Sequence, residues 1–170
     1  MLHTARRGRE GIDKLKKKHF VKSYDKKQKI YYYSKVCSER TKNHQKDEDV
    51  EVGGIIPFRE SIRGLNPGLF LQRFLGLLEP NNPNFFQRPK REGKKNNLHN
   101  PKTTVYFENS KVGINFVSLM MPKMCEAFGL ERRYTNCNIR PTSIRLMKRA
   151  RIEDRAIMSV SGHKDMKTLG

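Results

Sequence analysis

Residues 134–163 read YTNCNIRPTSIRLMKRARIEDRAIMSVSGH, and this stretch decides most of the fold that the sequence predicts. Thr135 or Asn136 can cap a helix that continues to about Arg149, because their side-chain oxygens accept hydrogen bonds from the first backbone N–H groups of a helix. A further helix is expected from Glu153 to Val160, and a Gly-His pair follows it. The block therefore predicts two consecutive helices that end close to a histidine.

Two more helices are expected upstream of this block. Pro67 suits the first position of a helix, apolar residues then recur at helical spacing, and the segment from Pro80 to Pro83 ends it. A second helix is expected from about Asn115 to Phe128, with Gly129 as its stop. Four of its apolar side chains are expected to face inward: Phe116, Leu119, Met120 and Met124.

The first part of the chain predicts a small antiparallel sheet. Residues 4–18 read as a short basic helix, and residues 20–23 and 30–36 follow as strands joined by a polar turn. The run Ile30-Tyr31-Tyr32-Tyr33 is rich in residues that favour strands. After an acidic, hydrophilic stretch, a return strand is expected near Ile55-Ile56.

The whole chain is expected to form one domain of mixed α+β class, mostly α, over residues 1–170, with the small sheet preceding the helices. Residues 88–104, RPKREGKKNNLHNPKTT, lack any apolar period and are expected to form an exposed basic loop. The stretch from Arg88 to Lys95 is suited to lie along a phosphate backbone. A polar loop without that role fits the same residues equally well.

The charge balance points to a polyanionic partner. The chain holds 36 Lys+Arg against 17 Asp+Glu, for a formal net charge of +19. Such an excess repels itself in a compact state, and nucleic acid relieves that repulsion because neutralised phosphates release condensed counterions. A membrane surface is the rival, but no stretch reaches the length of a transmembrane helix, and the basic residues do not line a strongly apolar helix. Double-stranded DNA is therefore the expected partner, and a membrane is not.

The three cysteines, Cys37, Cys125 and Cys137, are far apart and odd in number. The sequence contains no CxxC pair, so it supports neither a zinc ribbon nor a disulfide framework. This usage fits a reducing compartment, the cytosol or the nucleus. We expect no metal and no other cofactor.

Four dispersed side chains have the chemistry needed to handle a phosphodiester: Arg7 in RRGRE, Lys42 in RTKN, Arg140 in NIRPT and His163 in SGHK. Two guanidiniums suit the charge on the non-bridging oxygens, because each can donate two parallel hydrogen bonds to a phosphate. A lysine can protonate a departing oxygen, and an imidazole can hydrogen-bond the same phosphate. Each residue taken singly also fits a solvated surface position, so their order and surroundings carry the inference.

That order resembles the catalytic domain of the tyrosine recombinases, the phage-integrase superfamily, and most nearly its eukaryotic Crypton-type branch with the domesticated host descendants. RRGRE is similar to the family's R-x-x-E pattern, which selects Arg7 over Arg6 and Arg9. The block that contains Arg140 and His163 is similar to the family's H-x-x-R segment, helix and G-H pattern. The resemblance implies DNA strand cleavage and rejoining, as in DNA integration and recombination, without a metal or nucleotide cofactor.

The resemblance also implies a role for each of the four residues. Arg7 and Arg140 would clamp the scissile phosphate. Lys42 would lie on a mobile β-hairpin and protonate the departing 5′ oxygen. His163 would hydrogen-bond the phosphate or position the nucleophile.

Two departures from the family pattern bear on activity. Cys137 stands where the pattern has its first histidine, and we expect it to be a buried small residue, although a thiol near cationic arginines ionises more easily. The nucleophilic tyrosine would lie about nine residues after His163, beyond Gly170. We therefore expect a domain truncated at both ends and inactive in cis, with a tyrosine supplied by a neighbouring protomer left open. The tyrosines that do not match the nucleophile's position are Tyr24, Tyr31, Tyr32, Tyr33, Tyr106 and Tyr134.

Further basic residues are expected to contact DNA and to widen the electropositive face: Arg6, Arg9, Lys95, Arg145, Lys148 and Arg149. The expected function is that of a nuclear, DNA-binding, recombinase-like domain able to form a homo-oligomer on DNA. The alternative is a domesticated, non-catalytic nuclear module that binds a protein partner or regulates transcription. A ribosomal or other RNA-binding protein fits the charge equally well, but it leaves the four ordered residues unexplained.

Overall fold

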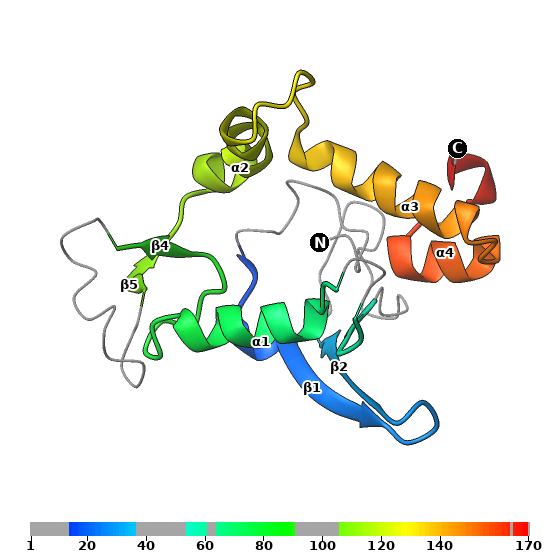
Figure 1. Cartoon of the computed structure of the whole chain (residues 1–170), viewed down its shortest axis with the longest axis horizontal. Helices are drawn as coiled ribbons and strands as arrows, with labels where there is room; N and C mark the ends of the chain where they lie inside the picture. The colour runs from blue at the N-terminus through cyan, green and yellow to red at the C-terminus, as the bar shows by residue number, and fades with distance from the viewer. Residues whose placement is uncertain (1–13, 37–53, 61–63, 91–105, 164, 170) are drawn as a thin grey trace.

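The computed structural model describes residues 14–36, 54–60, 64–90, 106–163 and 165–169. In this part of the chain the protein is of mixed α+β class, with two small antiparallel sheets and more residues in helices than in strands. Figure 1 shows one sheet beside helix α1 (Pro67–Leu77) and a separate pair of helices, α3 (Ile139–Arg149) and α4 (Asp154–Ser161). The α+β class and the antiparallel sheet predicted from the sequence are therefore confirmed.

The first sheet has the strand order β1-β2-β3, with β1 at Phe20–Asp25, β2 at Ile30–Lys35 and β3 at Ile55–Pro57. Its strands lie where the sequence predicted them, and both pairings are antiparallel. In the turn between β1 and β2, Asp25 Oδ1 accepts hydrogen bonds from the backbone N–H groups of Lys27 at 2.8 Å and Gln28 at 3.1 Å. Such an Asx turn is favoured because the carboxylate replaces a backbone acceptor.

Helix α1 covers part of this sheet. Its first turn is capped by Asn66, whose Oδ1 accepts from the Leu69 N–H at 3.0 Å, and Pro67 occupies the position that the sequence predicted. The helix approaches β3 closely at Gly68, where an added Cβ would lie 2.6 Å from Cδ2 of Phe58. A side chain there would force the helix away from the sheet.

The basic helix predicted over residues 4–18 lies mostly outside the described residues, and its described end is not an α-helix. Leu15 is buried, Lys16 forms an isolated antiparallel bridge with Asn84, and a single 3₁₀ turn, η3, covers Lys17–His19. The Phe85 N–H donates to the Leu15 carbonyl at 2.9 Å. Backbone pairing with a distant segment therefore replaces the hydrogen bonds that a helix would make here.

The second sheet, β4 (Gln87–Pro89) paired with β5 (Phe107–Lys111), was not predicted. Arg88 and Pro89 are exposed as predicted, but the prediction of a loop there was wrong, because both lie in β4. Residues 91–104 of the predicted loop lie outside the described part of the chain. Pro89 is tolerated because β4 is an edge strand and the register is irregular beside it. Neither strand is rich in strand-forming residues, so the pairing depends on contacts between distant segments.

Gln87 explains why so short a strand is held in place. Its side chain is 2 % exposed and accepts from the Glu79 N–H at 2.7 Å. Its amide nitrogen lies within hydrogen-bonding distance of the carbonyls of Glu79, Asn82 and Asn84, at 3.3, 3.0 and 2.9 Å. One buried amide thus bonds to backbone groups of three residues in the turn after α1, and buried backbone groups need such partners.

Helix α2 runs from Ile114 to Ala127, within one residue of the prediction, and Gly129 ends the segment with a φ of +61°. The predicted inward face was wrong, because Val117 and Cys125 are the buried residues. Of the four residues predicted to face inward, only Met120 packs against the buried pair of Val112 and Val117. The exposed fractions of the other three are 46 % for Phe116, 43 % for Leu119 and 49 % for Met124.

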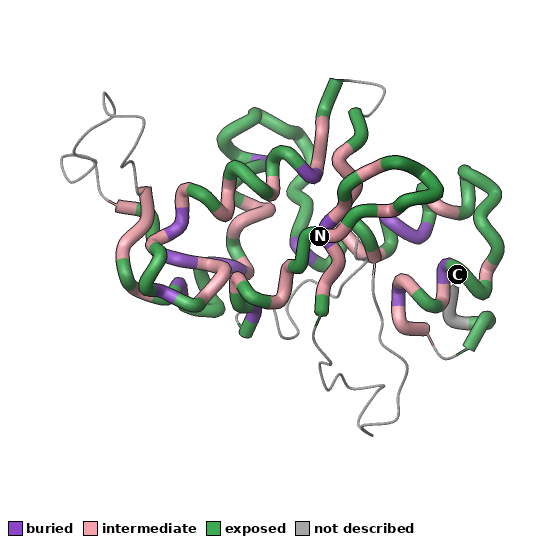
Figure 2. The backbone as a smooth tube through the Cα atoms, turned by 90° about the horizontal axis from the view of Figure 1, so that it is seen from below, coloured by how far each residue is buried: buried purple, intermediate pink, exposed green. Residues whose placement is uncertain are grey.

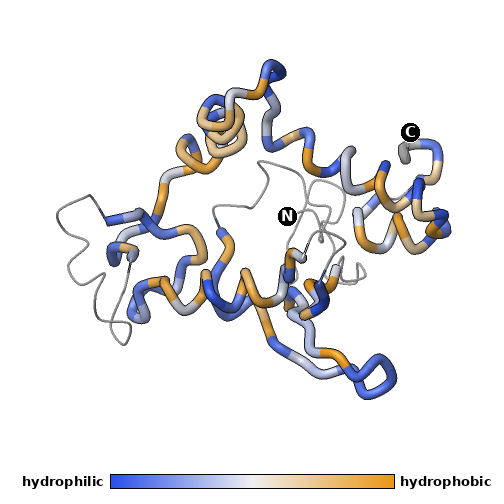
Figure 3. The backbone as a smooth tube through the Cα atoms, in the orientation of Figure 1, coloured by the Kyte–Doolittle hydropathy of each residue, from blue (hydrophilic) through white to orange (hydrophobic). Residues whose placement is uncertain are grey.

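The error on α2 has a simple origin. The helix is apolar on most of its surface, as Figure 3 shows, so its periodicity does not distinguish a buried face from an exposed one. Figure 2 shows the buried residues as short separate patches along the chain. Packing against neighbouring elements therefore decides which face of α2 is buried.

Candidate functional site

Helices α3 and α4 bring together two of the four residues singled out in the sequence. The helices pack through Ile144, which is 7 % exposed, and Ile157, which is fully buried, with Met147 and Met158 beside them. Arg140 is the second residue of α3, and His163 follows the end of α4. The hydrophobic contact between the helices therefore determines where both polar side chains lie.

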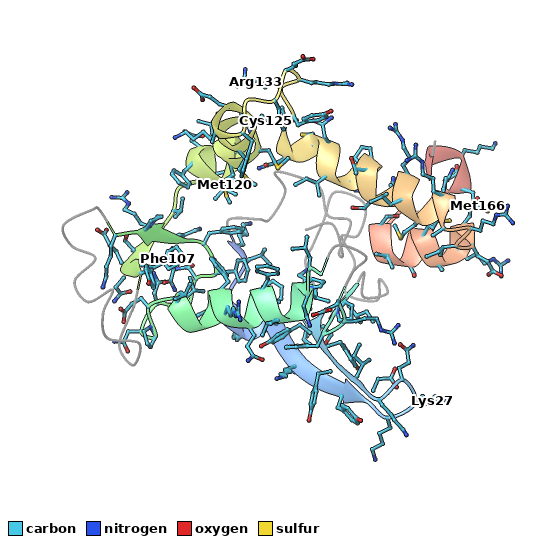
Figure 4. All side chains as sticks on the ribbon, in the orientation of Figure 1. Lys27, Phe107, Met120, Cys125, Arg133 and Met166 are labelled. Atoms are coloured by element: carbon cyan, nitrogen blue, oxygen red, sulfur yellow. The ribbon has the colours of Figure 1, made fainter. Side chains whose placement is uncertain are left out.

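The start of α3 is held against α2 by two buried groups. The Asn136 side-chain amide donates to the Val117 carbonyl at 2.7 Å, and Asn136 is 4 % exposed. The Sγ atom of Cys125 lies 3.4 Å from the Tyr134 backbone nitrogen and 3.8 Å from its carbonyl oxygen. Figure 4 shows Cys125 on α2 next to the segment that leads into α3. These contacts set the position of the 3₁₀ turn η4, which covers Asn136–Asn138.

Thr135 stands at the N-cap position of η4, as the sequence predicted, but the capping acceptor in the hydrogen bonds here is the side chain of Asn138. The Thr135 N–H donates to Asn138 Oδ1 at 2.8 Å, and the Thr135 hydroxyl lies 3.1 Å from the same oxygen. Pro141 fits the first turn of α3, where its missing N–H has no intrahelical acceptor to lose. The predicted helix from residue 135 to about residue 149 is thus confirmed as a 3₁₀ turn followed by α3.

Gly162 places His163 back towards α3. It ends α4 in the left-handed conformation, with a φ of +69°, and its N–H donates to the Met158 carbonyl at 2.7 Å. Glycine adopts this conformation without the steric cost that a Cβ would add. The chain therefore reverses direction sharply enough for the Nδ1 atom of His163 to lie 2.7 Å from the Ser161 hydroxyl oxygen.

Arg140 and His163 are in direct contact. The Nη2 atom of Arg140 lies 3.2 Å from Nδ1 and 3.3 Å from Nε2 of His163. A donor in the plane of an imidazole cannot be so near both nitrogens without colliding with the carbon between them. The Nη2 atom of Arg140 therefore lies over the face of the imidazole ring.

This geometry suits an anion with several oxygens. A guanidinium and an imidazole that lie little more than 3 Å apart can both reach oxygens of one phosphate group. The guanidinium supplies a permanent positive charge and a rigid fork of donors. Ser161 is 5 % exposed, and its hydroxyl group contacts the Nδ1 atom of His163 and so orients the imidazole.

The neighbouring basic residues on α3 lie on other faces of the helix. A helix turns about 100° per residue, so Arg145 lies about 140° around the axis from Arg140 and Arg149 about 180°. Arg145, Lys148 and Arg149 are exposed. Arg145 and Arg149 therefore form a second basic surface on the outer side of α3, whereas Lys148 is about 80° around the axis from Arg140 and lies between the two surfaces.

Cys137 is exposed on η4, three residues before Arg140, so the prediction of a buried cysteine was wrong. The buried position in this turn belongs to its neighbour Asn136, which is tied to α2. Cys37 lies outside the described residues.

The other residues predicted for the site lie outside the part of the chain that the structure describes: Arg6, Arg7, Arg9, Lys42 and Lys95. One contributor was missed by the sequence analysis, namely Ser161. The signal was present in SGHK, because a glycine between two polar residues at a helix end brings them together.

A comparison of the chain with protein-family models and with curated protein sequences finds no match. The recombinase resemblance therefore rests on the residues themselves. Within the described ranges, no helix is both long enough and apolar enough to cross a membrane. The same residues contain no group of three or more His, Cys, Asp or Glu side chains placed to hold a metal ion.

Proposed function

We propose that the chain is a DNA-binding domain of the tyrosine-recombinase type, in which Arg140 and His163 bind one phosphate of the duplex backbone. The observation that supports this proposal best is the contact of 3.2–3.3 Å between these side chains, which are 23 residues apart in the sequence. The chemistry of both side chains suits a phosphate, independently of their contact. A chance pair of surface residues would have no reason to meet.

Charge supports the same partner. The net charge of +19 favours a polyanion, and the exposed residues Arg145, Lys148 and Arg149 add positive charge to α3. Contacts of basic residues with phosphates release counterions, so the affinity for duplex DNA should fall steeply with salt concentration. Location in the nucleus belongs to the proposal, since the partner is DNA.

The chain is proposed to be inactive in cis, so strand cleavage would depend on a tyrosine supplied by a neighbouring protomer. In the resembled chemistry a tyrosine attacks the phosphate, and two arginines neutralise the negative charge of the phosphate oxygens. A lysine protonates the departing 5′ oxygen. Arg140 and His163 would serve the charge neutralisation. Arg7 and Lys42 would supply the second guanidinium and the proton.

The test is a titration of fluorescein-labelled duplex DNA, followed by fluorescence anisotropy at several salt concentrations. Arg140→Ala should weaken binding by about tenfold or more, because a hydrogen bond to a charged group contributes about 1.5–3 kcal/mol. Arg145→Ala on the outer side of α3 is the matched control, and we expect a loss of only about two- to threefold from one solvated contact. Arg140→Lys separates charge from geometry, since lysine lacks the bidentate fork.

A double-mutant cycle sharpens the result. If Arg140 and His163 share one phosphate, the losses from Arg140→Ala and His163→Ala should be non-additive by at least about 0.5 kcal/mol. Thermal melting of each variant establishes that it is folded. Equal losses for Arg140→Ala and Arg145→Ala, with no coupling to His163, would refute the phosphate site. Duplex binding that is insensitive to salt would favour the alternative role of a non-catalytic protein-binding module.

A further inference from the structure

The β1–β2 hairpin carries a row of aromatic rings that runs from the core to solvent. Tyr33 is 7 % exposed and its ring lies 5.5 Å from that of Phe58, which in turn lies 6.4 Å from Tyr31. Tyr31 and Tyr24 are cross-strand partners with ring centroids 4.8 Å apart. The inner end of the row is anchored, whereas Tyr31 is 52 % exposed and Tyr24 is 48 % exposed.

A lysine stiffens the middle of this row. Lys22 Nζ lies 4.9 Å from the centroid of the Tyr31 ring and 4.6 Å from that of Phe58, and it donates to Gln72 Oε1 of α1 at 2.9 Å. Cation–π contacts and the link to α1 restrict the Tyr31 ring without covering the outer part of the pair. Two large rings are thus held in place and partly open to solvent.

The turn next to these rings is strongly basic. Three of its four residues are exposed lysines, Lys26, Lys27 and Lys29. The neighbouring carboxylate of Asp25 accepts two backbone hydrogen bonds of the turn. Figures 1 and 4 show the hairpin extending away from α1, with Lys27 at its far end. Positive charge therefore gathers beside the exposed end of the aromatic row.

We infer that the end of the β1–β2 hairpin binds a single strand of nucleic acid, with unpaired bases stacked on Tyr24 and Tyr31 and phosphates contacted by Lys26, Lys27 and Lys29. Aromatic rings beside a basic surface are the combination that binds single strands, because every base has a face that can stack and every nucleotide has a phosphate. The bases of an intact duplex are stacked on each other and do not offer these faces.

A peptide partner fits the hairpin less well. A proline-rich or apolar peptide would use the rings but would have no need of three lysines at the turn. An acidic peptide would use the lysines but not the rings. A single strand uses both sets of groups at once, so charge and shape favour the same occupant. This inference does not rest on the Arg140–His163 site, which lies on other elements.

The experiment compares two probes of equal charge on the full chain: a fluorescein-labelled oligothymidylate of about twelve nucleotides, and the same strand with abasic sites. The double variant Tyr24→Leu/Tyr31→Leu should bind the oligothymidylate at least about thirtyfold more weakly than the wild type, because stacking on each ring is lost. Tyr24→Phe/Tyr31→Phe keeps both rings and should bind like the wild type. The abasic strand should not distinguish the wild type from the leucine variant.

The lysines give an independent readout. Lys26→Ala/Lys27→Ala/Lys29→Ala should lower the magnitude of the salt slope by about two, since each single-strand phosphate contact contributes about 0.7 to it. The leucine variant should leave that slope unchanged. Arg140→Ala should weaken the oligothymidylate and the abasic strand by the same factor, because that site recognises phosphate alone, whereas the leucine variant should weaken only the oligothymidylate. A failure of the duplex phosphate site is therefore recognisable separately from a failure here.

A measurement on the wild type guards against misfolding of the variants. The chain has no tryptophan, so its intrinsic emission comes from tyrosine. The oligothymidylate should quench this emission, whereas the abasic strand should not. The inference is overturned if the leucine variant binds the oligothymidylate as tightly as the wild type, if the phenylalanine variant loses as much as the leucine variant, or if both strands quench equally.

Discussion

The β1–β2 hairpin and the α3–α4 pair are both basic and both present polar or aromatic groups, but they are assembled in different ways. In the hairpin, Tyr24 and Tyr31 are seven residues apart and meet through strand register and a local turn. In the helix pair, Arg140 and His163 are 23 residues apart and meet because Ile144 packs on Ile157. A local turn therefore controls one surface, and burial of apolar side chains controls the other.

This difference predicts how each surface responds to substitution. A change in the core between α3 and α4 should separate Arg140 from His163 even though neither residue is altered. The hairpin should be insensitive to that change and should respond instead to Asp25, which closes its turn. The following experiments separate these two dependences, beginning with the largest expected effect.

Ile157→Ala should destabilise the fold by about 3 kcal/mol, because removal of a fully buried side chain leaves a cavity between α3 and α4. It should also weaken duplex binding as strongly as Arg140→Ala does. Leu146→Ala on the exposed side of α3 is the control, since Leu146 is 52 % exposed. Urea denaturation gives the stability. If Ile157→Ala and Leu146→Ala have equal effects, the helix pair does not depend on this core.

Asn136→Ala should lower the free energy of unfolding by about 2 kcal/mol. The substitution removes a buried donor and leaves the Val117 carbonyl without that partner. The neighbouring Asn138 is exposed, and its side chain caps a single turn, so Asn138→Ala should cost about 1 kcal/mol. Denaturant titration of both variants checks the order, and the reverse order would show that the contact between η4 and α2 is weak.

Asp25→Ala should destabilise the chain by about 1 kcal/mol through the loss of two side-chain hydrogen bonds to the turn. It should leave the affinity for duplex DNA at the Arg140–His163 site unchanged. Asp25→Asn retains an acceptor oxygen and should recover most of the loss. Amide hydrogen exchange of residues 20–35 measures the effect locally. Faster exchange spread over α3 and α4 instead would contradict the independence of the two regions.

The smallest expected effect is the loss of stability when Tyr33 titrates at alkaline pH. Burial raises the pKa of Tyr33 above its ordinary value of about 10, because desolvation disfavours the phenolate. The pKa is higher in the folded chain than in the unfolded chain, so stability is fully present below about pH 10 and is lost as pH rises through the folded value. When the pH is raised from neutral to above about 10, the free energy of unfolding should therefore fall less for Tyr33→Phe than for the wild type. Parallel losses in thermal melts would argue against titration of Tyr33.

Much of the fold could be predicted because its signals are local. Pro67, Gly129 after an apolar run, and Thr135 before the third predicted helix are signals that act near helix ends, and each lies beside a helix end in the structure. The run Ile30-Tyr31-Tyr32-Tyr33 predicted β2 for the same reason. These residues act on their own neighbours, so no knowledge of distant segments is needed.

The errors arise where distant segments meet. β4 and β5 are paired although neither is rich in strand formers, and Gln87 secures them through backbone groups that the sequence does not mark. Cys137 is exposed because Asn136 takes the buried place beside α2. The missed contact of Ser161 with His163 is a local exception, because it joins residues two apart through the left-handed conformation of Gly162.

The sequence by itself determined the basic charge, the helix ends, the strand-forming Tyr run and the residue types suited to phosphate, because each depends on composition or on nearby neighbours. Only the tertiary structure decided which face of α2 is buried, where Pro89 can join a strand, and that Arg140 lies against His163. These features depend on burying apolar surface between segments far apart in the chain. Their free energy exists only when both segments are in place.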